Sequence, residues 1–342
     1  MPNSKRRKKR LNARGIAFFT FLGLVLLLGI ILIIAAVNKS KSQKDEGTVS
    51  YIVSEETVVS ETTEETTPSP TPAPSLNVIG SIYSSEAILL DAETGAVLDE
   101  LNPDVQAYPA SVTKLMTLLL ACENLTDYDA TYSIPREIYD DLYYKDLSTA
   151  GYEFGETITI DDMLYGLMLR SGAECCLGLA YNVSGSEDAF VVLMNERAEE
   201  LGMTGTHFCN CTGLHDDNHY STVRDMATLL LEGLKNDKFR EVFSTMVYTS
   251  TPTTIHPGGL TIYSTFYQTL YSLDFEGGSF IGGKTGYTSQ AGQCLATAAT
   301  IDGHEYILVT FGAYPDTTQT NTTSHLHSAD AINIYQRLAK VI

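Results

Sequence analysis

Strand-like segments stand at both ends of the long C-terminal region of this 342-residue chain, and a mostly helical stretch separates them. Near the start, Ala87–Asp91 and Ala96–Asp99 flank Glu93-Thr94-Gly95, a hairpin pattern with glycine in the turn. Near the end, Asp302-Gly303 marks a second tight hairpin between the last two of three strand-like runs. These three runs are Ser279–Thr288, Gln293–Ile301 and Glu305–Ala313. Strands from the two ends can form one antiparallel sheet only if the middle of the chain lies outside it as a helical lobe.

The middle of the chain carries helical patterns. Ser111–Glu123 is apolar on most sides, as a buried helix is. Thr222 followed by Asp225 resembles a capping box at a helix start. The other segments with helical patterns are Asp161–Leu169, Glu187–Leu201, Thr222–Leu234 and the amphipathic Ala329–Ile342. We therefore predict an α+β fold, with an antiparallel five-stranded sheet from both chain ends, flanked by helices, and a helical lobe.

A basic cluster followed by an apolar run opens the chain. Seven lysines and arginines lie within residues 1–15, and the run Ile16–Val37 is uncharged over 22 residues. As a helix this run spans roughly 33 Å, enough to cross a bilayer core. Because such basic residues stay in the cytoplasm, we predict a cytoplasmic segment at 1–15, a transmembrane anchor at 16–37 and an exported remainder. A signal peptide cleaved near Ala35-Ala36 is the alternative, although secretory apolar regions span only about 7–15 residues.

Residues 38–80 have the composition of a linker. They are rich in Thr, Ser and Glu and include four alternating prolines at positions 68–74, and such segments stay extended and solvated. From position 45 onward, 12 basic residues stand against 42 acidic ones. This excess of negative charge argues against a nucleic-acid partner and against docking on anionic lipid. We predict a soluble ectodomain, residues 81–342, tethered by its N-terminus.

All six cysteines lie in the exported part, which invites a disulfide interpretation. The pairs Cys175-Cys176 and Cys209-x-Cys211 are too close in sequence for an ordinary bridge. Cys122 and Cys294 lie in apolar helix-like and strand-like runs. We therefore predict buried free thiols, with disulfide pairing as the alternative.

Ser111-Val112-Thr113-Lys114 opens the apolar helix that follows Tyr108-Pro109-Ala110. Residues three apart share a helix face, so the Lys114 amine can reach the Ser111 hydroxyl. A serine hydroxyl needs a base to become a nucleophile, and a lysine serves if burial and nearby positive charge lower its pKa. The pattern alone is common by chance, and a helix cap followed by a surface lysine is the ordinary alternative.

Two further motifs follow this one along the chain. Ser171-Gly172-Ala173 stands between two helix-like runs, and Lys284-Thr285-Gly286 lies on a late, glycine-rich strand. Glycine in a strand lets a ligand backbone approach closely, and a lysine there offers a charge to a carboxylate. Each motif alone also fits an ordinary turn or bulge. In this order and spacing, the three are the signature of penicillin-binding proteins and serine β-lactamases.

Longer stretches resemble one family, the D-alanyl-D-alanine carboxypeptidases among the low-molecular-mass penicillin-binding proteins. The likeness runs from about residue 84 to 342 and includes every motif above. The stretches that carry it are PASVTKLMT (109–117), SGAE (171–174), ELGMTGTHFCNCTGLHDDNHYSTVRDMA (200–227) and GGKTGYTSQAGQCLATAA (282–299). The resemblance implies a β-lactamase-like fold and an extracytoplasmic serine DD-peptidase domain at 81–342.

The resemblance also implies roles for individual residues. Ser111 would be the acylated nucleophile, Lys114 its general base and Ser171 a proton shuttle near the leaving group. Lys284, with Thr285 and Gly286, would hold the substrate carboxylate, and the backbone N–H groups of Ser111 and Tyr287 would form the oxyanion hole. The implied substrate is a peptidoglycan stem pentapeptide ending in D-Ala-D-Ala, which loses its last residue through an acyl-enzyme. β-Lactams would acylate the same serine, and no cofactor is implied.

The chain departs from the family pattern at two places. The middle motif of the family reads Ser-x-Asn, and its third place here is Ala173. We expect the Glu174 carboxylate to substitute in part for the missing amide, with altered rate or substrate preference. Family members often carry an arginine before the last helix that binds the substrate carboxylate, and here His325 and His327 stand near that place. A histidine there could donate a hydrogen bond, with a charge that varies near neutral pH.

The competing interpretations use the same residues. His215, Asp216, Asp217 and His219 suggest a metal site, but a structural loop explains them better because no further spaced ligand set follows. A β-lactamase needs a base for deacylation, and no Glu-x-x-Leu-Asn stretch follows the middle motif to supply it. A wall-binding or β-lactam-sensing module without turnover, and an endopeptidase that cuts crosslinks, also stay open.

Overall fold

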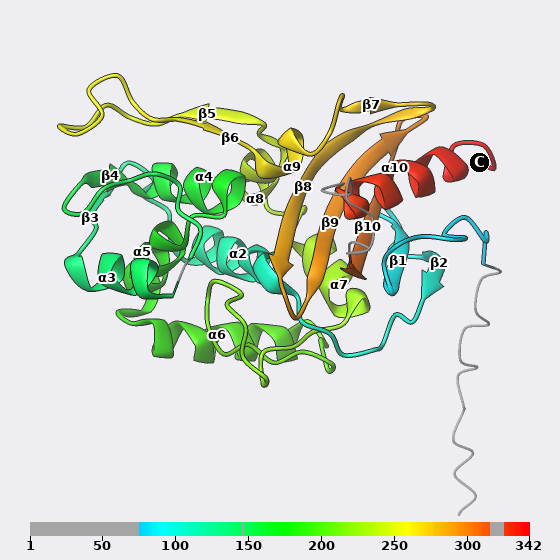
Figure 1. Cartoon of the computed structure of the whole chain (residues 1–342), viewed down its shortest axis with the longest axis horizontal. Coiled ribbons are helices and arrows are strands. Elements are labelled where there is room, and N and C mark those ends of the chain that lie inside the picture. Colours follow the sequence, from blue (N-terminus) through cyan, green and yellow to red (C-terminus); the bar gives the residue numbers. More distant parts are fainter. Residues whose placement is uncertain (1–74, 146, 315–324) are drawn as a thin grey trace, which may run out of the picture. The chain divides into compact units, whose positions relative to one another are not determined.

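The structure, a computed structural model, describes residues 75–145, 147–314 and 325–342 (Figure 1). They all belong to one compact unit, Ser69–Ile342. The cytoplasmic segment and the anchor that we predict lie outside the described residues, as does most of the linker. Within the described ranges, every helix is too short or too polar to span a bilayer.

A six-stranded antiparallel sheet is the centre of the fold, with the strand order β2-β1-β10-β9-β8-β7 (Figure 1). Its strands are β1 (Glu86–Asp91), β2 (Val97–Leu101), β7 (Asp274–Phe275), β8 (Gly278–Thr288), β9 (Gly292–Ile301) and β10 (His304–Ala313). Strand β1 pairs with β10, so strands from the two ends of the domain lie side by side as the second and third strands of the sheet. The prediction of an α+β fold with a sheet from both chain ends is confirmed. The sixth strand, β7, was not predicted, because a strand of two residues is too short to show an alternating hydrophobic pattern.

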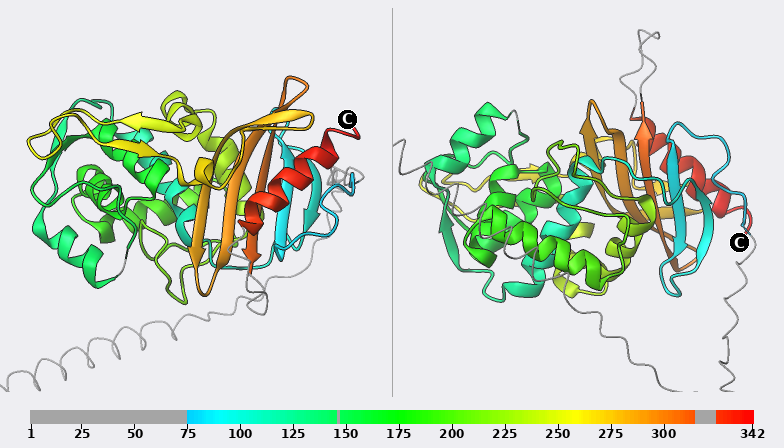
Figure 2. Two further views of the ribbon diagram at one scale, coloured as in Figure 1. Left: turned by 45° about the horizontal axis from the view of Figure 1, so that its top comes forward. Right: turned by 90° about the horizontal axis from the view of Figure 1, so that it is seen from below.

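The two faces of the sheet belong to two different hydrophobic cores. Along β1, Ile88 and Leu90 enter one core, while Ala87 and Leu89 enter the other, because successive strand side chains point to opposite faces. Helix α10 (Leu326–Leu338) crosses the second face (Figure 2). The first face is covered by the helical lobe. Both faces are therefore shielded from water, and each fully buried leucine contributes about 1.5–3 kcal/mol.

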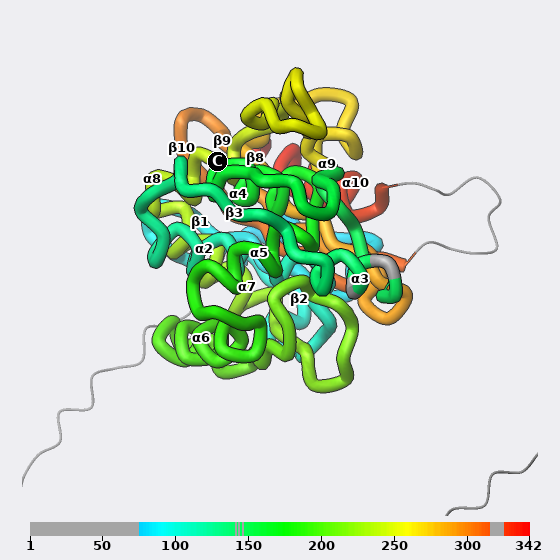
Figure 3. Tube along the Cα trace, turned by 90° about the vertical axis from the view of Figure 1, so that its left-hand side faces the viewer, coloured from blue at the N-terminus to red at the C-terminus, as the bar shows by residue number. Residues whose placement is uncertain are grey.

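The helical lobe is formed by the segment between β2 and β7, and Figure 3 looks onto it from the side away from the sheet. Two short antiparallel strand pairs belong to the lobe. Strand β3 (Thr131–Ser133) pairs with β4 (Thr157–Thr159), with a helix between them in the sequence, and β5 (Val247–Thr249) pairs with β6 (Thr261–Tyr263). The helices are the 3₁₀ turn η1 (Ala110–Thr113), α2 (Lys114–Asn124), α3 (Arg136–Tyr144), α4 (Ile160–Arg170), α5 (Ala173–Ser184), α6 (Glu187–Glu200), α7 (Val223–Gly233), α8 (Asp237–Ser244) and α9 (Thr265–Gln268).

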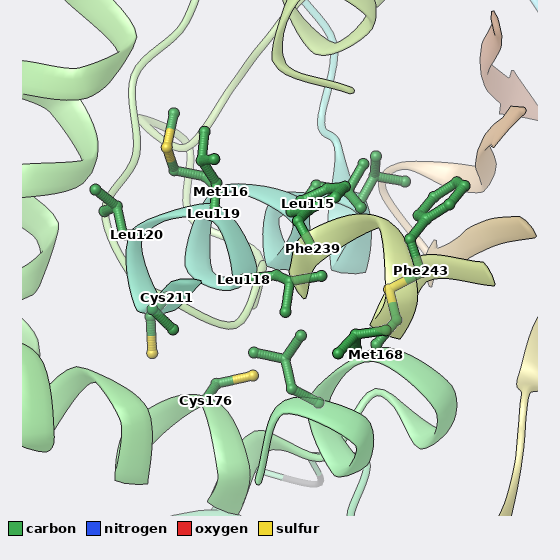
Figure 4. Packing of buried hydrophobic residues seen from close by; sticks show 14 of the residues in the cluster. Leu115, Met116, Leu118, Leu119, Leu120, Met168, Cys176, Cys211, Phe239 and Phe243 are labelled. Carbon is green, nitrogen blue, oxygen red and sulfur yellow. The ribbon is translucent and has the colours of Figure 1, made fainter. Parts of the chain in front are cut away.

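Helix α2 lies at the centre of the lobe and is buried from Lys114 to Cys122. Its Leu115 and Leu118 are fully buried, and Figure 4 shows the α2 side chains packed with Phe239 and Phe243 of α8. Truncation of a leucine in such a core costs about 2–5 kcal/mol. The helix that carries the first sequence motif is thus held rigidly on all sides.

The predicted helices differ from the observed ones mainly at their ends. Helix α2 begins at Lys114, because Ser111 lies in the preceding 3₁₀ turn. Helix α10 begins at Leu326 and ends at Leu338. The capping box predicted at Thr222 is only half formed, because Asp225 binds Gly205 N and Thr206 Oγ1 instead of the cap. A complete capping box, which the sequence analysis did not predict, is formed by Thr159 and Asp162 at the start of α4.

All six cysteines are free thiols, as predicted. Five are buried, and Cys209 is half-buried. Burial raises the pKa of the Cys122, Cys176 and Cys294 thiols to about 12. A thiol with such a pKa stays protonated at neutral pH and reacts slowly.

Candidate active site

A cavity of about 630 Å³ lies where the β8 side of the sheet meets the helical lobe. Segments far apart in the sequence contribute to its wall: η1, the turn between α4 and α5, helix α9, strands β8 and β9, and the start of α10. The described residues that line it are Ser111, Ser148, Arg170, Ser171, Thr265, Gln268, Thr269, Thr285, Gly286, Tyr287, Gln293, His325 and His327. Five of the seven predicted site residues are among them, and the two lysines lie directly behind.

Ser111 and Lys114 form the first pair. Nζ of Lys114 lies 3.1 Å from Oγ of Ser111 and 2.5 Å from the carbonyl oxygen of Thr212. Lys114 is only 2% exposed, so the ordinary alternative of a surface lysine is excluded. The 3₁₀ turn at η1 followed by a regular helix places the two side chains on one side of the chain, as the motif predicts. A neutral amine in this position can accept the Ser111 proton.

The loop at 210–214 fixes the backbone beside Ser111. Oδ1 of Asn210 accepts hydrogen bonds from the backbone N–H groups of Thr212, Gly213 and Leu214. Gly213 has a φ of +79°, and a Cβ added there would overlap the carbonyl oxygen of Ala110. Only glycine permits this close approach. The residue before Ser111, Ala110, itself has a φ of +46°, an unfavourable conformation for a residue with a side chain.

Ser171 and Lys284 form the second pair across the cavity. Ser171 is the C-cap residue of α4 and has a left-handed backbone conformation with a φ of +62°. Nζ of Lys284 donates to Oγ of Ser171 at 3.1 Å and to the carbonyl of Thr285 at 2.8 Å. Burial and the nearby Lys114 hold the pKa of Lys284 well below its ordinary value. The site therefore contains two buried amines that cannot both be charged without mutual repulsion.

Strand β8 brings the last motif against the nucleophile. A Cβ added at Gly286 would lie 3.0 Å from the carbonyl oxygen of Pro109 and 3.0 Å from the amide nitrogen of Ser111. Thr285 is held by a hydrogen bond of 3.0 Å between its hydroxyl and that of Thr265. Tyr287 is 62% exposed at the rim. Gly286 thus permits the close approach of two segments of the protein, whereas the sequence interpretation assigned the strand glycines to the approach of a ligand backbone.

Glu174 does not take the place that we expected for it. Its Oε1 accepts hydrogen bonds from the backbone N–H groups of Ala150 at 2.6 Å and Gly151 at 3.1 Å, and it does not line the cavity. Ala173 N donates to the carbonyl of Ser148 in the same loop. The carboxylate therefore anchors the 148–151 loop rather than replacing the amide of the middle motif. Burial, opposed by these backbone hydrogen bonds, raises its pKa to about 7.

His327 also differs from expectation. It lines the cavity as predicted, but it is buried, and burial with the neighbouring His325 lowers its pKa to about 4. At neutral pH it is an uncharged ring whose Nδ1 lies 2.8 Å from Oε1 of Gln293. The expectation of a charge that varies near neutral pH is therefore wrong for His327. His325 precedes α10 and is exposed.

The histidine and aspartate cluster forms a structural loop. Nε2 of His219 lies 2.8 Å from the Thr113 hydroxyl, and its Nδ1 accepts the backbone N–H of Cys209 at 3.0 Å. Burial lowers the pKa of His219 to about 4. His215 packs edge-on against Tyr108. Since both nitrogens of His219 bind the protein, this ring braces the helix turn after Ser111 and leaves no ring nitrogen for a metal.

Several residues of the cavity wall had no sequence signal of their own. Ser148 and Thr265 lie in segments without recognisable periodicity, and Gln293 opens a strand. Arg170 was overlooked, although it could have been noticed as a charge directly before the middle motif. These residues are brought together by tertiary contacts alone.

Comparison with known proteins gives a consistent result. A family model described as D-alanyl-D-alanine carboxypeptidase matches residues 68–315. D-alanyl-D-alanine carboxypeptidase DacF of Bacillus subtilis (strain 168) is 34% identical over 233 residues, which cover 67% of this chain and 57% of the relative. A D-alanyl-D-alanine carboxypeptidase of Streptomyces sp. (strain K15) is 34% identical over 222 residues, which cover 63% of this chain and 75% of the relative. The crystal structure of the Streptomyces K15 DD-transpeptidase aligns with a TM-score of 0.66 at 27% identity, and the alignment covers 77% of this chain and 98% of that one.

Proposed function

The chain belongs to the D-alanyl-D-alanine carboxypeptidase family, and we propose that it is an extracytoplasmic serine DD-carboxypeptidase that trims peptidoglycan stem pentapeptides. One observation carries the proposal: Nζ of the buried Lys114 lies 3.1 Å from Oγ of Ser111 at the cavity wall. A nucleophile with a base in hydrogen-bond reach is the minimum requirement for acyl transfer. The second pair, Lys284 with Ser171, supports the same reaction.

Acylation follows from this geometry. Nζ of Lys114, acting as the general base, takes the proton from Ser111 Oγ as the oxygen attacks the carbonyl carbon between the two D-Ala residues. A C–O bond to Ser111 forms, the C–N bond to the terminal D-Ala breaks, and the leaving nitrogen receives a proton through the Ser171 hydroxyl. The backbone N–H groups of Ser111 and Tyr287 stabilise the tetrahedral oxyanion, an effect worth about 3–4 kcal/mol per donor.

Deacylation reverses the same steps with water. Water adds to the ester carbonyl, its proton passes to the Lys114 amine, and the ester C–O bond breaks. The stem peptide leaves with a new terminal carboxylate, and Ser111 regains its proton. A β-lactam would form the same ester with Ser111, and its slow hydrolysis would make it an inhibitor.

Lys284 has a further role in this scheme. The pKa of Lys284 is lowered by burial and by the neighbouring Lys114 amine. A bound substrate carboxylate would offset both effects and favour the protonated amine, since an opposite charge nearby favours the charged form. Thr285 and Gly286 would flank the substrate on β8 by main-chain pairing.

The proposed location is the outer face of the cell membrane. Support comes from the basic residues before Ile16 and from the apolar run that follows, which lie outside the described residues. We propose that this run anchors the chain with its N-terminus in the cytoplasm. The Pro- and Thr-rich linker would then separate the catalytic domain from the bilayer and let it reach the wall.

The proposal is tested with the purified full chain in detergent, as wild type and as Ser111→Ala. Each is incubated with labelled penicillin and with a peptide that ends in D-Ala-D-Ala. We expect covalent label and D-Ala release in the wild type only. Release of D-Ala by both proteins, or label in neither, would overturn the proposal. Label without release would favour a β-lactam sensor, and rapid turnover of bound penicillin would favour a β-lactamase.

A second experiment asks whether water or an amine accepts the acyl group from the enzyme. The Streptomyces K15 relative appears under the names carboxypeptidase and DD-transpeptidase. The acyl-enzyme proposed here could likewise be attacked by an amine in place of water. Adding a free amino-acid acceptor to the peptide assay, and measuring how product divides between hydrolysis and transfer, separates these reactions. Crosslinked muropeptides in the same assay test for endopeptidase activity.

A further inference from the structure

Arg170 gives the cavity a permanent positive charge. It is the last residue of α4, it is exposed, and its side chain lines the cavity beside Ser171. Among the residues that the structure describes, the Arg170 side chain makes no hydrogen bond or ion pair. The chain as a whole has a net charge of −20, yet none of the described residues that line the cavity is acidic. An anionic ligand would therefore meet attraction here and no repulsion from this wall.

The other basic groups near the cavity offer an anion fewer free donors than Arg170 does at neutral pH. His327 is buried and uncharged at that pH, and its Nδ1 is engaged with Gln293. Lys284 is fully buried, has a depressed pKa and already donates to Ser171 and Thr285. Arginine keeps its charge at every physiological pH and offers two parallel N–H donors that match a carboxylate.

The position of Arg170 matches the leaving-group side of the cavity. Its neighbour Ser171 binds Lys284, and α4 packs against α9. Helix α9 contributes Thr265, whose hydroxyl bonds to that of Thr285 on β8. Arg170 therefore lines the same cavity as Ser171, which binds Lys284, and as Thr285 of the last motif.

We propose that Arg170 binds the C-terminal carboxylate of the substrate and so selects peptides with a free terminal D-Ala. The inference rests on the proposed function and names the specificity-determining residue of the same site. The ordinary alternative is that Arg170 only interacts with the carbonyl groups at the C-terminus of α4, as cations in the last turn do. That role would affect stability but would not distinguish one substrate from another.

The test compares two peptide substrates that differ only in whether the C-terminus is a carboxylate or an amide. Diacetyl-L-Lys-D-Ala-D-Ala carries a single carboxylate, and its C-terminal amide carries none. The value of kcat/KM for both peptides is measured with the full chain as wild type, Arg170→Gln and Arg170→Lys. Arg136→Gln is the matched control, because Arg136 is also an exposed helical arginine, with a side chain that is 71% exposed and does not line the cavity.

We expect Arg170→Gln to lower the acid-to-amide ratio of kcat/KM about tenfold or more, because a charge-assisted hydrogen bond to the acid is lost. Arg170→Lys should keep part of the ratio, and Arg136→Gln should keep all of it. An unchanged ratio in a folded Arg170→Gln would overturn the inference.

Failure of the proposed function would appear differently. If the wild type neither releases D-Ala nor reacts with penicillin, the proposed activity is wrong. The binding of the same two peptides is then measured by calorimetry with Ser111→Ala and with the double variant Ser111→Ala/Arg170→Gln. These affinities show whether Arg170 binds the carboxylate. Tighter binding of the acid that disappears with Arg170→Gln supports the inference. Equal binding of the acid and the amide to both proteins overturns it.

Discussion

Nζ of Lys284 lies 3.1 Å from Oγ of Ser171, and this hydrogen bond joins strand β8 to the turn between α4 and α5. The two residues are far apart in the chain, and their contact crosses from the sheet to the helical lobe. The bond also links a buried amine with a depressed pKa to a hydroxyl at the cavity wall. The site thus depends on the relative position of two parts of the fold.

Replacing Ser171 by alanine should slow acylation without unfolding the protein. The change removes the hydroxyl proposed to pass a proton to the leaving nitrogen, and such groups contribute about 10²–10⁴-fold. The rate of labelling by penicillin measures the effect. Ser148→Ala is the control, because Ser148 lines the same cavity and is exposed. Equal effects of the two substitutions would argue against a proton shuttle at Ser171.

Lys284→Met should lower the rate of D-Ala release by roughly 100-fold or more. The melting temperature of the variant at pH 7 should equal or exceed that of the wild type. The pKa of Lys284 is lowered in the folded state. Between that value and 10.5 the unfolded chain binds more protons, so wild-type stability rises with pH over this window. The advantage of Met should therefore shrink as pH rises. Thermal unfolding at pH 7 and pH 9 measures it, and a variant far less stable than wild type would contradict the prediction.

Glu174→Gln should remove a pH dependence of stability. Burial raises the pKa of the folded carboxyl from 4.5 to about 7, so the folded state keeps a proton that the unfolded chain has lost. Wild-type stability should consequently fall as pH rises from 4.5 to 7, by on the order of 3 kcal/mol. The glutamine side chain keeps an oxygen acceptor for the backbone N–H of Ala150 and carries no charge. Unfolding in denaturant across this pH range should show a flatter curve for the variant.

Glu199→Gln is the control for that experiment, because Glu199 is exposed on α6. Its stability curve should follow the wild type. If Glu174→Gln retained the wild-type slope, the buried carboxyl would be ionised throughout this range in the folded protein.

Gly213→Ala should damage the site, and Gly185→Ala should not. Both glycines have a left-handed conformation, with φ of +79° and +82°. Both substitutions therefore cost the same backbone strain, about 1 kcal/mol. Only at Gly213 does the new methyl group meet the carbonyl of Ala110, whereas nothing lies within 4 Å at Gly185. The difference in denaturation midpoint and in penicillin labelling between the two variants isolates the clash beside Ser111.

The sequence predicted the parts of this fold that have regular patterns. Strands β8, β9 and β10 are proline-free runs bounded by turn residues, and their bounds differ from the prediction by one residue or less. Helix α5 was missed because Ala173–Ser184 is buried over most of its length and shows no polar face. Helix α3 and the short strand pairs β3–β4 and β5–β6 were not predicted, because short elements depend on tertiary contacts.

The site could be predicted where short-range spacing determines it. Ser111 and Lys114 are three residues apart, so local helix geometry alone brings them together. The side chains of Glu174 and His327 were assigned incorrectly because their partners, Ala150 and Gln293, come from distant segments. The role proposed for Arg170 depends on a cavity that segments far apart in the sequence form together.

The pairing of β1 with β10 has a consequence for how the domain is made. Glu86 at one end of the domain lies opposite Phe311 near the other, so the pairing of β1 with β10 has a high contact order. Closing so large a loop costs chain entropy before any strand contact repays it, which slows folding. If the domain is exported as proposed, β1 can pair with β10 only after the chain has emerged as far as Ala313. The cavity needs β8 and the start of α10, so it can form only after residues up to His327 are free to fold.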